Sequence, residues 1–192
     1  MKSVFKRIIT LASVVIMLSI LIMLASCDAY DSVIESFLKS DNYTVESENY
    51  TLTVDGAAVN FKMEDNQLYL YYDKSAKSYY YVTVVEDEIT KLAIDSEQYI
   101  TYYKAIVLPA SNMAAKLSGF MQIRDHFEEA DGKYTIKDGE EGSFSVSINE
   151  GIITIEVDND GENNDYSYKI YNVGDTDVDI PDKVNTAKVQ EE

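Results

Sequence analysis

Few residues in this chain have the type and spacing that metal chemistry requires. Glu156, Asp158 and Asp160 place oxygen ligands at alternate positions with Gly161 at the sixth, which resembles the first half of a Ca²⁺-binding EF-hand loop. The twelfth position is Ser167, where such a loop needs a bidentate glutamate. We therefore interpret this stretch as a solvated hairpin turn and expect no metal site.

Residues for acid–base or nucleophilic catalysis are equally sparse. His126, the one histidine, follows Asp125, but the chain has no G-x-S-x-G elbow, and adjacency in sequence does not create a proton relay. Asp175, Asp177 and Asp179 alternate as on one face of a strand, a pattern that more often protects a sheet edge than binds a cation. We expect a protein that is not an enzyme and has no cofactor, with His126 at the surface near a helix end.

The first 27 residues have the three parts of an export signal. Residues 1–7 are basic, an uncharged and mostly apolar run extends from Ile8 to Ala25, and small residues precede Cys27, the single cysteine. The run of 18 residues is at the lower limit for spanning a bilayer. Its length alone does not distinguish a cleaved signal from a permanent anchor.

The tetrapeptide Leu24-Ala25-Ser26-Cys27 resembles the lipobox of bacterial lipoproteins. The resemblance implies that the thiol of Cys27 receives a diacylglyceryl group and that signal peptidase II cleaves just before it. We then expect a signal peptide over residues 1–26, a lipidated tether over 27–30, one mostly-β domain over 31–184 and a disordered tail over 185–192. The expected location is the extracytoplasmic face of the cell membrane. The alternative is a buried structural cysteine after an ordinary signal or membrane helix.

Charge limits the partners of this chain. Its 192 residues include 16 basic and 34 acidic side chains, for a formal net charge of −18. Nucleic-acid binding needs a Lys/Arg footprint that this composition lacks, and anionic lipid headgroups would repel the chain. We therefore expect no nucleic acid as a partner, and attachment to the membrane through the lipid on Cys27 alone. A protein partner is not indicated by the sequence.

Residues 42–107 alternate β-branched and aromatic runs with polar turns, a pattern typical of antiparallel strands. The expected strands of this meander cover residues 43–54, 57–63, 68–72, 79–85, 89–94 and 99–107. A second group of strands is expected over 133–137, 143–148, 152–158, 166–171 and 177–180.

Two helices are expected beside these strands. Residues 31–39 have apolar side chains at helical spacing, and Ser32 with Glu35 matches a capping box. After Pro109, residues 110–129 repeat apolar side chains at steps of three and four, which indicates an amphipathic helix.

The order helix, meander, helix, meander, with the ending from Tyr171 to Pro181, resembles the LolA-like and LppX-like lipoproteins. The resemblance covers about residues 31–184. It implies an α+β, mostly β fold in which an antiparallel meander forms a half-open barrel covered by two helices. It also implies a carrier of lipids or lipidated proteins. No ligand-contacting residue of those families can be matched to a position in this chain.

We expect a non-catalytic binding module for a hydrophobic, lipid-like ligand held between the second helix and the sheet. The expected ligand-binding residues are Leu117, Phe120, Met121, Phe127, Phe61 and Leu70. Val59, Leu68, Ile153 and Ile155 would line the same space from the sheet. The alternative is that these residues form a packed core, in an interaction or structural lipoprotein of the cell envelope.

Tyrosine is the most unusual feature of the composition, with 16 tyrosines and no tryptophan. Three expected strands carry clusters of them, at 69–72, 79–81 and 99–103, so both faces of the sheet receive rings. A tyrosine combines apolar area with a polar tip, which suits a surface that binds a partner. The ordinary alternative is that tyrosine replaces Phe and Trp as the β-forming residue of this protein.

Overall fold

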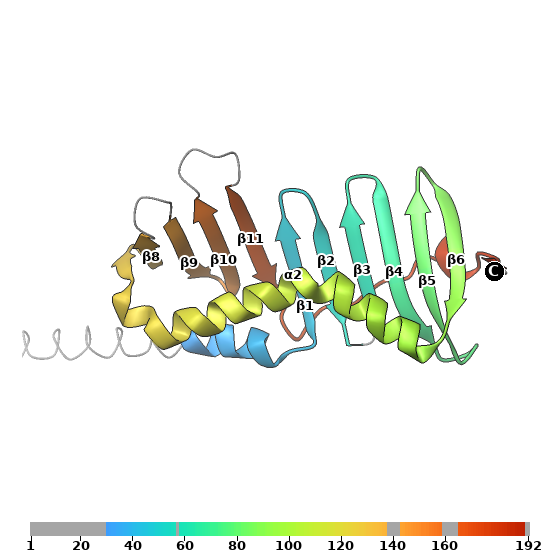
Figure 1. Cartoon of the computed structure of the whole chain (residues 1–192), viewed down its shortest axis with the longest axis horizontal. Helices are drawn as coiled ribbons and strands as arrows, with labels where there is room; N and C mark the ends of the chain where they lie inside the picture. Colours follow the sequence, from blue (N-terminus) through green and yellow to red (C-terminus); the bar gives the residue numbers. More distant parts are fainter. Residues whose placement is uncertain (1–29, 57, 138–142, 159–164, 191–192) are drawn as a thin grey trace, which may run out of the picture.

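The computed structural model describes residues 30–56, 58–137, 143–158 and 165–190, and every strand of this part belongs to one open sheet (Figure 1). Across the sheet the strands are β12 (Val189–Gln190), β6 (Glu88–Ile94), β5 (Ser78–Val85), β4 (Asn66–Asp73), β3 (Ala58–Met63), β2 (Thr51–Asp55), β1 (Asn42–Ser47), β11 (Tyr166–Tyr171), β10 (Ile152–Asp158), β9 (Ser143–Asn149), β8 (Lys133–Lys137) and β7 (Glu128–Ala130). The expected α+β, mostly β architecture is confirmed: the sheet is not closed and is antiparallel except where β12 pairs with β6.

The first and last long strands join two meanders into this one sheet. β1 pairs with β11 in antiparallel register, with Val45 opposite Ile170, and both residues are fully buried. Val45 also lies opposite Leu52 of β2, which is equally buried. The apolar row therefore continues without interruption across the junction between the meanders.

The long helix α2 (Ser96–Ile123) crosses one face of the sheet from β6 toward β8 (Figure 1). Its buried residues recur at helical spacing and pack on the apolar row of the sheet; they are Tyr99, Val107, Ala110, Met113, Leu117 and Phe120. A first helix, residues 30–39, adds Ile34 and Phe37 to the same core. Both expected helices thus cover the same apolar core.

The strand expected over 99–107 is wrong, because these residues form the first part of α2. Asp95 caps the helix by accepting hydrogen bonds from the amides of Glu97 and Gln98, each at 2.8 Å. The side chain of Gln98 in turn accepts from the amide of Asp95 at 3.0 Å, which completes a capping box. Pro109, which was expected to open the helix, lies inside it.

The ends of two other expected elements also differ. α2 stops at Ile123 and is followed by the 3₁₀ turn η1 (Arg124–His126), so Phe127 lies outside the helix that was expected to reach 129. The strand expected over 43–54 is a hairpin of β1 and β2, in which the amide of Ser47 donates to the carbonyl of Tyr50 at 2.8 Å. This hairpin places Tyr50 at the start of β2, beside the face covered by α2.

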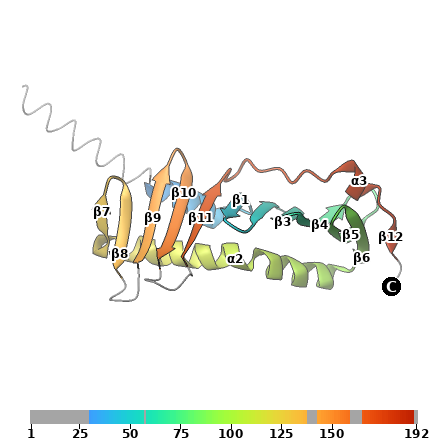
Figure 2. The same cartoon turned by 90° about the horizontal axis from the view of Figure 1, so that it is seen from above.

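After β11 the chain crosses the opposite face of the sheet and reaches α3 (Asp182–Asn185) and then β12 (Figure 2). Val184 is fully buried there against a second cluster that contains Tyr71, Tyr80 and Val82. The ammonium of Lys91 donates to the carbonyl of Asn185 at 2.6 Å and lies 4.3 Å from the ring centre of Tyr80. The C-terminal segment therefore covers its own small core.

Two expectations for this segment are corrected. Residues 177–180 form no strand, because the chain there runs outside the sheet. The disordered tail expected from 185 is replaced, as far as residue 190, by the end of α3 and by β12, which pairs in parallel with β6. No helix in the described ranges is long and apolar enough to cross a membrane. Cys27 and the apolar run before it lie outside those ranges.

Candidate functional site

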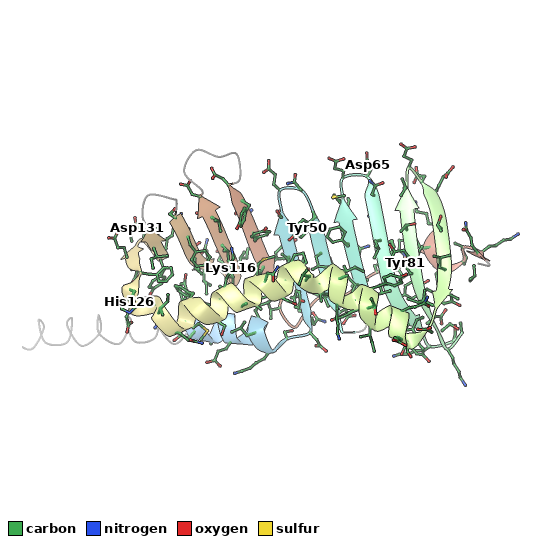
Figure 3. All side chains as sticks on the ribbon, viewed as in Figure 1. Tyr50, Asp65, Tyr81, Lys116, His126 and Asp131 are labelled. Atoms are coloured by element: carbon green, nitrogen blue, oxygen red, sulfur yellow. The ribbon has the colours of Figure 1, made fainter. Side chains whose placement is uncertain are left out.

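A groove with a volume of about 350 Å³ lies between the middle of α2 and the junction of the two meanders. Its lining residues come from the helix, from strands β10 and β11, and from the turn before β2. They are Tyr50, Leu108, Pro109, Asn112, Met113, Lys116, Ile155, Tyr166 and Tyr168. Figure 3 shows Tyr50 and Lys116 on the same side of α2, in front of the strands.

The base of the groove is apolar and its wall is aromatic. Met113 of α2 and Ile155 of β10 are both buried in the main core where they meet the groove. A row of rings follows the strands: Tyr166 and Tyr168 lie 5.2 Å apart between centroids, and Tyr168 and Tyr50 lie 6.4 Å apart. Aromatic and aliphatic surfaces of this kind are the usual lining of small-molecule sites.

Local sequence explains why these residues meet. Alternate residues of a strand point to the same face, so Tyr166 and Tyr168 share the face of β11 that α2 covers. Tyr168 is opposite Ile155 of β10 on one side and opposite Ser47 of β1 on the other. The hairpin after Ser47 then brings Tyr50 back beside Tyr168.

Lys116 supplies the positive charge of the groove. Its ammonium donates to the hydroxyl of Tyr166 at 3.2 Å and lies 5.3 Å from the centre of that ring. The same ammonium lies 6.0 Å from the ring centre of Phe144. Two aromatic faces therefore hold the cation at the edge of the groove.

The hydroxyl of Tyr50 is buried and has no hydrogen-bond partner among the residues that the structure describes. Burial, together with the neighbouring Tyr168, raises the pKa of Tyr50 to about 12. The phenol therefore remains protonated at neutral pH. A buried polar group without a partner costs about 1–3 kcal/mol, so the ring of Tyr50, and not its hydroxyl, is the part that can meet a molecule in the groove.

Burial of tyrosine hydroxyls predicts a loss of stability at alkaline pH. Burial raises the pKa of Tyr43, Tyr50, Tyr71 and Tyr99 to about 12 in the folded chain, whereas an exposed phenol loses its proton near pH ~10. Between these values the unfolded chain binds fewer protons than the folded chain, so the free energy of unfolding falls as pH rises.

The measurement is the near-ultraviolet absorbance of tyrosinate, followed against pH in the folded chain and in urea. We expect a group of tyrosines that titrates late in the folded chain and joins the others in urea. If all tyrosines of the folded chain titrated together near pH ~10, the burial of these hydroxyls would be refuted.

The ligand-binding residues expected from sequence have other places in the structure. Leu117, Phe120 and Leu70 are buried in the main core with 0%, 2% and 0% of their surface exposed. Met121 and Phe127 are partly buried and pack against the same core. None of these five lines the groove described above.

Phe61 and Ile155 link the expected set to the groove. The ring of Phe61 lies 5.3 Å from that of Tyr50, so it extends the aromatic row into β3 without lining the groove itself. Ile155, expected on the sheet side of the ligand space, does line it. The groove lies between the helix and the sheet, as the expected ligand space does, but its helix residues lie about two turns earlier than Leu117, Phe120 and Met121.

No protein-family model, curated protein or solved structure matches this chain.

The other candidate chemistry of the sequence forms no site in the described ranges. Glu156 accepts a hydrogen bond from the ammonium of Lys133, which lowers the pKa of its carboxyl, while Asp160 and Gly161 lie outside those ranges. His126 is exposed in η1. In the part of the chain that the structure describes, no group of three or more His, Cys, Asp or Glu side chains could hold a metal ion.

Sequence analysis missed most of the groove residues. Leu108 and Pro109 lie just after the strand expected over 99–107, whereas Asn112 lies in the helix expected over 110–129, so the sequence did not indicate that all three share one helix. The signal that could have identified them is the capping pair Asp95 and Gln98, which sets the start of the helix.

Proposed function

We propose that this chain is a membrane-anchored, extracytoplasmic lipoprotein that binds a ligand with an apolar chain in the groove between α2 and the sheet. The observation that carries the proposal is the groove itself, with its apolar base of Met113 and Ile155 and its wall of tyrosine rings. A cavity of about 350 Å³ lies within the usual size range of small-molecule sites. An acyl chain can exclude water from such a surface without any polar contact of its own.

A binding role agrees with the chemistry of the lining better than catalysis does. The nine lining residues include no histidine, serine, cysteine or carboxylate. A tyrosine with a pKa of about 12 is a hydrogen-bond donor at neutral pH rather than a base. The groove is therefore suited to hold a molecule and not to transform it.

The start of the domain is compatible with a short lipid anchor. Tyr30, expected in the tether, is already helical, and its hydroxyl donates to the carbonyl of Val146 in β9 at 2.9 Å. Its ring meets that of Tyr134 in β8 at 4.9 Å. Two residues, Asp28 and Ala29, lie between Cys27 and Tyr30, so the two Cα atoms can be at most about 10 Å apart. A lipid on Cys27 would hold the β8–β9 end of the sheet close to the membrane.

Replacing Cys27 with serine is expected to abolish lipid attachment, because a hydroxyl does not replace the thiol in diacylglyceryl transfer. The variant should accumulate as an unprocessed precursor that incorporates no radiolabelled fatty acid. Ser26→Ala, which keeps a small residue before the cysteine, should be labelled and processed normally. Labelling and cleavage of the Cys27→Ser chain at the unchanged position would contradict the lipid anchor.

Ligand binding is tested by native mass spectrometry of the chain extracted from membranes. We expect a non-covalent adduct that carries an acyl chain, in addition to the covalent lipid on Cys27. The adduct should dissociate at low collision energy while the covalent lipid remains. An extracted chain that is folded and carries no such adduct, even after incubation with acyl ligands, would contradict the proposal.

A second function is supported by the tyrosines beside the first turns of α2. Tyr72, Tyr79 and Tyr99 form a continuous row with centroid distances of 4.8 and 4.6 Å, and Tyr81 meets Tyr102 at 4.9 Å. Tyr72 and Tyr102 each keep 38% of their surface exposed. Figure 3 shows Tyr81 near the β6 end of the sheet, away from Lys116. If the groove binds nothing, this face favours an envelope interaction protein.

A further inference from the structure

The charge of the groove differs from that of the rest of the chain. Acidic side chains outnumber basic ones by 34 to 16 in the sequence, yet Lys116 is the single charged residue among the nine that line the groove. The one other polar helix residue there is Asn112, one turn before Lys116 on the same side of α2. The groove therefore carries a positive charge, although the chain as a whole is acidic.

No carboxylate in the part of the chain that the structure describes neutralises Lys116. Lys39, Lys133 and Lys183 each form an ion pair with an acidic side chain, and Lys91 is buried against a carbonyl. Lys116 forms no ion pair with any residue that the structure describes; its contacts are the hydroxyl of Tyr166 and two ring faces. Aromatic faces attract a cation without neutralising its charge, so the ammonium can still bind an anion.

The position of Lys116 also fits the two parts of an amphiphile. Its ammonium lies at the exposed edge of the groove, while Met113, about one turn earlier on the helix, is buried at the base. If the acyl chain of a ligand packs on Met113 and Ile155, the polar end of that ligand lies beside Lys116 and Asn112. A charged headgroup would form its ion pair at the solvent boundary and avoid the cost of burial.

On the basis of the proposed function, we propose that the ligand is a single-chain amphiphile with an anionic headgroup, a carboxylate or a phosphate monoester, and that Lys116 recognises this headgroup. Neutral amphiphiles of equal chain length use the same apolar base but lack the charge-assisted contact. Cationic amphiphiles are repelled by the ammonium. Selectivity for the anionic headgroup therefore depends on Lys116, whereas binding of the ligand's acyl chain does not.

The test compares photoreactive C16 probes that differ only in their headgroup. The full-length chain is placed in phosphatidylcholine nanodiscs with a diazirine fatty acid or the matching fatty alcohol at equal mole fraction, and saturable labelling is mapped by peptide. We expect the wild type to label about three- to tenfold more strongly with the acid, the effect of one partly exposed charge pair. Lys116→Met should reduce labelling by the acid to the level of the alcohol and leave the alcohol unchanged.

Two controls identify what causes the preference for the acid probe. Lys104→Met removes an exposed lysine of the same helix that lies outside the groove, and it should preserve the preference for the acid. Competition by lysophosphatidic acid and by unlabelled fatty acid then distinguishes a phosphate from a carboxylate headgroup.

The possible outcomes separate this inference from the proposed function. If acid and alcohol label the groove equally in the wild type, anion recognition is refuted while the binding groove stands. If Lys116→Met reduced labelling by both probes equally, anion recognition would also be refuted, because Lys116 would then support the groove as a whole. If neither probe labels the groove saturably, the proposed function itself fails.

Discussion

Replacing Phe120 with alanine is expected to lower the free energy of unfolding by about 3–5 kcal/mol. Phe120 is only 2% exposed. Its ring meets that of Phe127 edge-on at 4.9 Å and that of Tyr134 at 5.6 Å, and it lies 6.3 Å from Tyr30. Truncation would leave a cavity at the point where α2, the first helix and β8 meet. Urea denaturation followed by circular dichroism measures the change.

Ile123→Ala is the matched control, because Ile123 lies on the same helix and is 46% exposed. This substitution should change the free energy of unfolding by no more than about 0.5 kcal/mol. A loss below about 1 kcal/mol for Phe120→Ala, together with weaker acyl binding, would contradict the core position and return Phe120 to the ligand-binding set expected from sequence.

Filling the groove with a large ring is expected to reduce acyl-chain binding at least about tenfold, which corresponds to about 1.4 kcal/mol. Asn112→Trp places an indole at an exposed position on the groove side of α2, where it can cover Met113 and Ile155. Because Asn112 is exposed, the stability of the fold should change by no more than about 0.5 kcal/mol. Binding is measured by titration with a fluorescent acyl probe.

Ala105→Trp controls for the added aromatic surface, since it lies two turns earlier on the same side of the helix and outside the groove. The chain contains no other tryptophan, so the emission of the new indole reports whether it occupies the apolar groove. Unchanged probe binding by a variant whose indole is buried would show that the acyl chain binds elsewhere.

The fold class could be predicted because the sheet follows local rules. Alternating apolar residues in the strands expected over 57–63, 79–85 and 152–158 predict one buried face, and the structure has β3, β5 and β10 there. The first helix was equally clear from its apolar spacing, but the capping box expected at Ser32 and Glu35 is wrong, because Tyr30 and Asp31 are already helical and Ser32 lies inside the helix. These elements are each specified by residues close together in sequence.

The first half of α2 could not be predicted from propensity. Residues 99–107 read Tyr-Ile-Thr-Tyr-Tyr-Lys-Ala-Ile-Val, and β-branched and aromatic residues favour strands when taken one at a time. Tertiary packing overrides this preference, because Tyr99 and Val107 lie on the stripe of α2 that faces the sheet. The same residues also carry a helical period, but their composition favours a strand.

The groove depends on contacts that no local pattern encodes. Tyr50 meets Tyr168 only because β1 pairs with β11, a contact between residues more than one hundred positions apart. The helix register, set at Asp95, then decides that Met113 and Lys116 meet this row and that Leu117 and Phe120 are buried beyond it. Sequence could predict an apolar helix over an apolar sheet, but not which side chains leave a space between them.

The central claim, that an acyl chain occupies the groove, is tested most directly by a tryptophan at its edge. Leu108→Trp replaces a lining residue that is 55% exposed, and Ile100→Trp introduces the same reporter about 12 Å away on the same helix, at a residue that is 51% exposed. Each full-length variant in nanodiscs is titrated with a brominated fatty acid, which quenches indole emission on contact. We predict saturable quenching of Trp at 108 that unlabelled fatty acid reverses, and only weak, non-saturable quenching at 100. Equal quenching of both reporters, or saturable quenching at 100 alone, would contradict the claim and favour the tyrosine face near the start of α2.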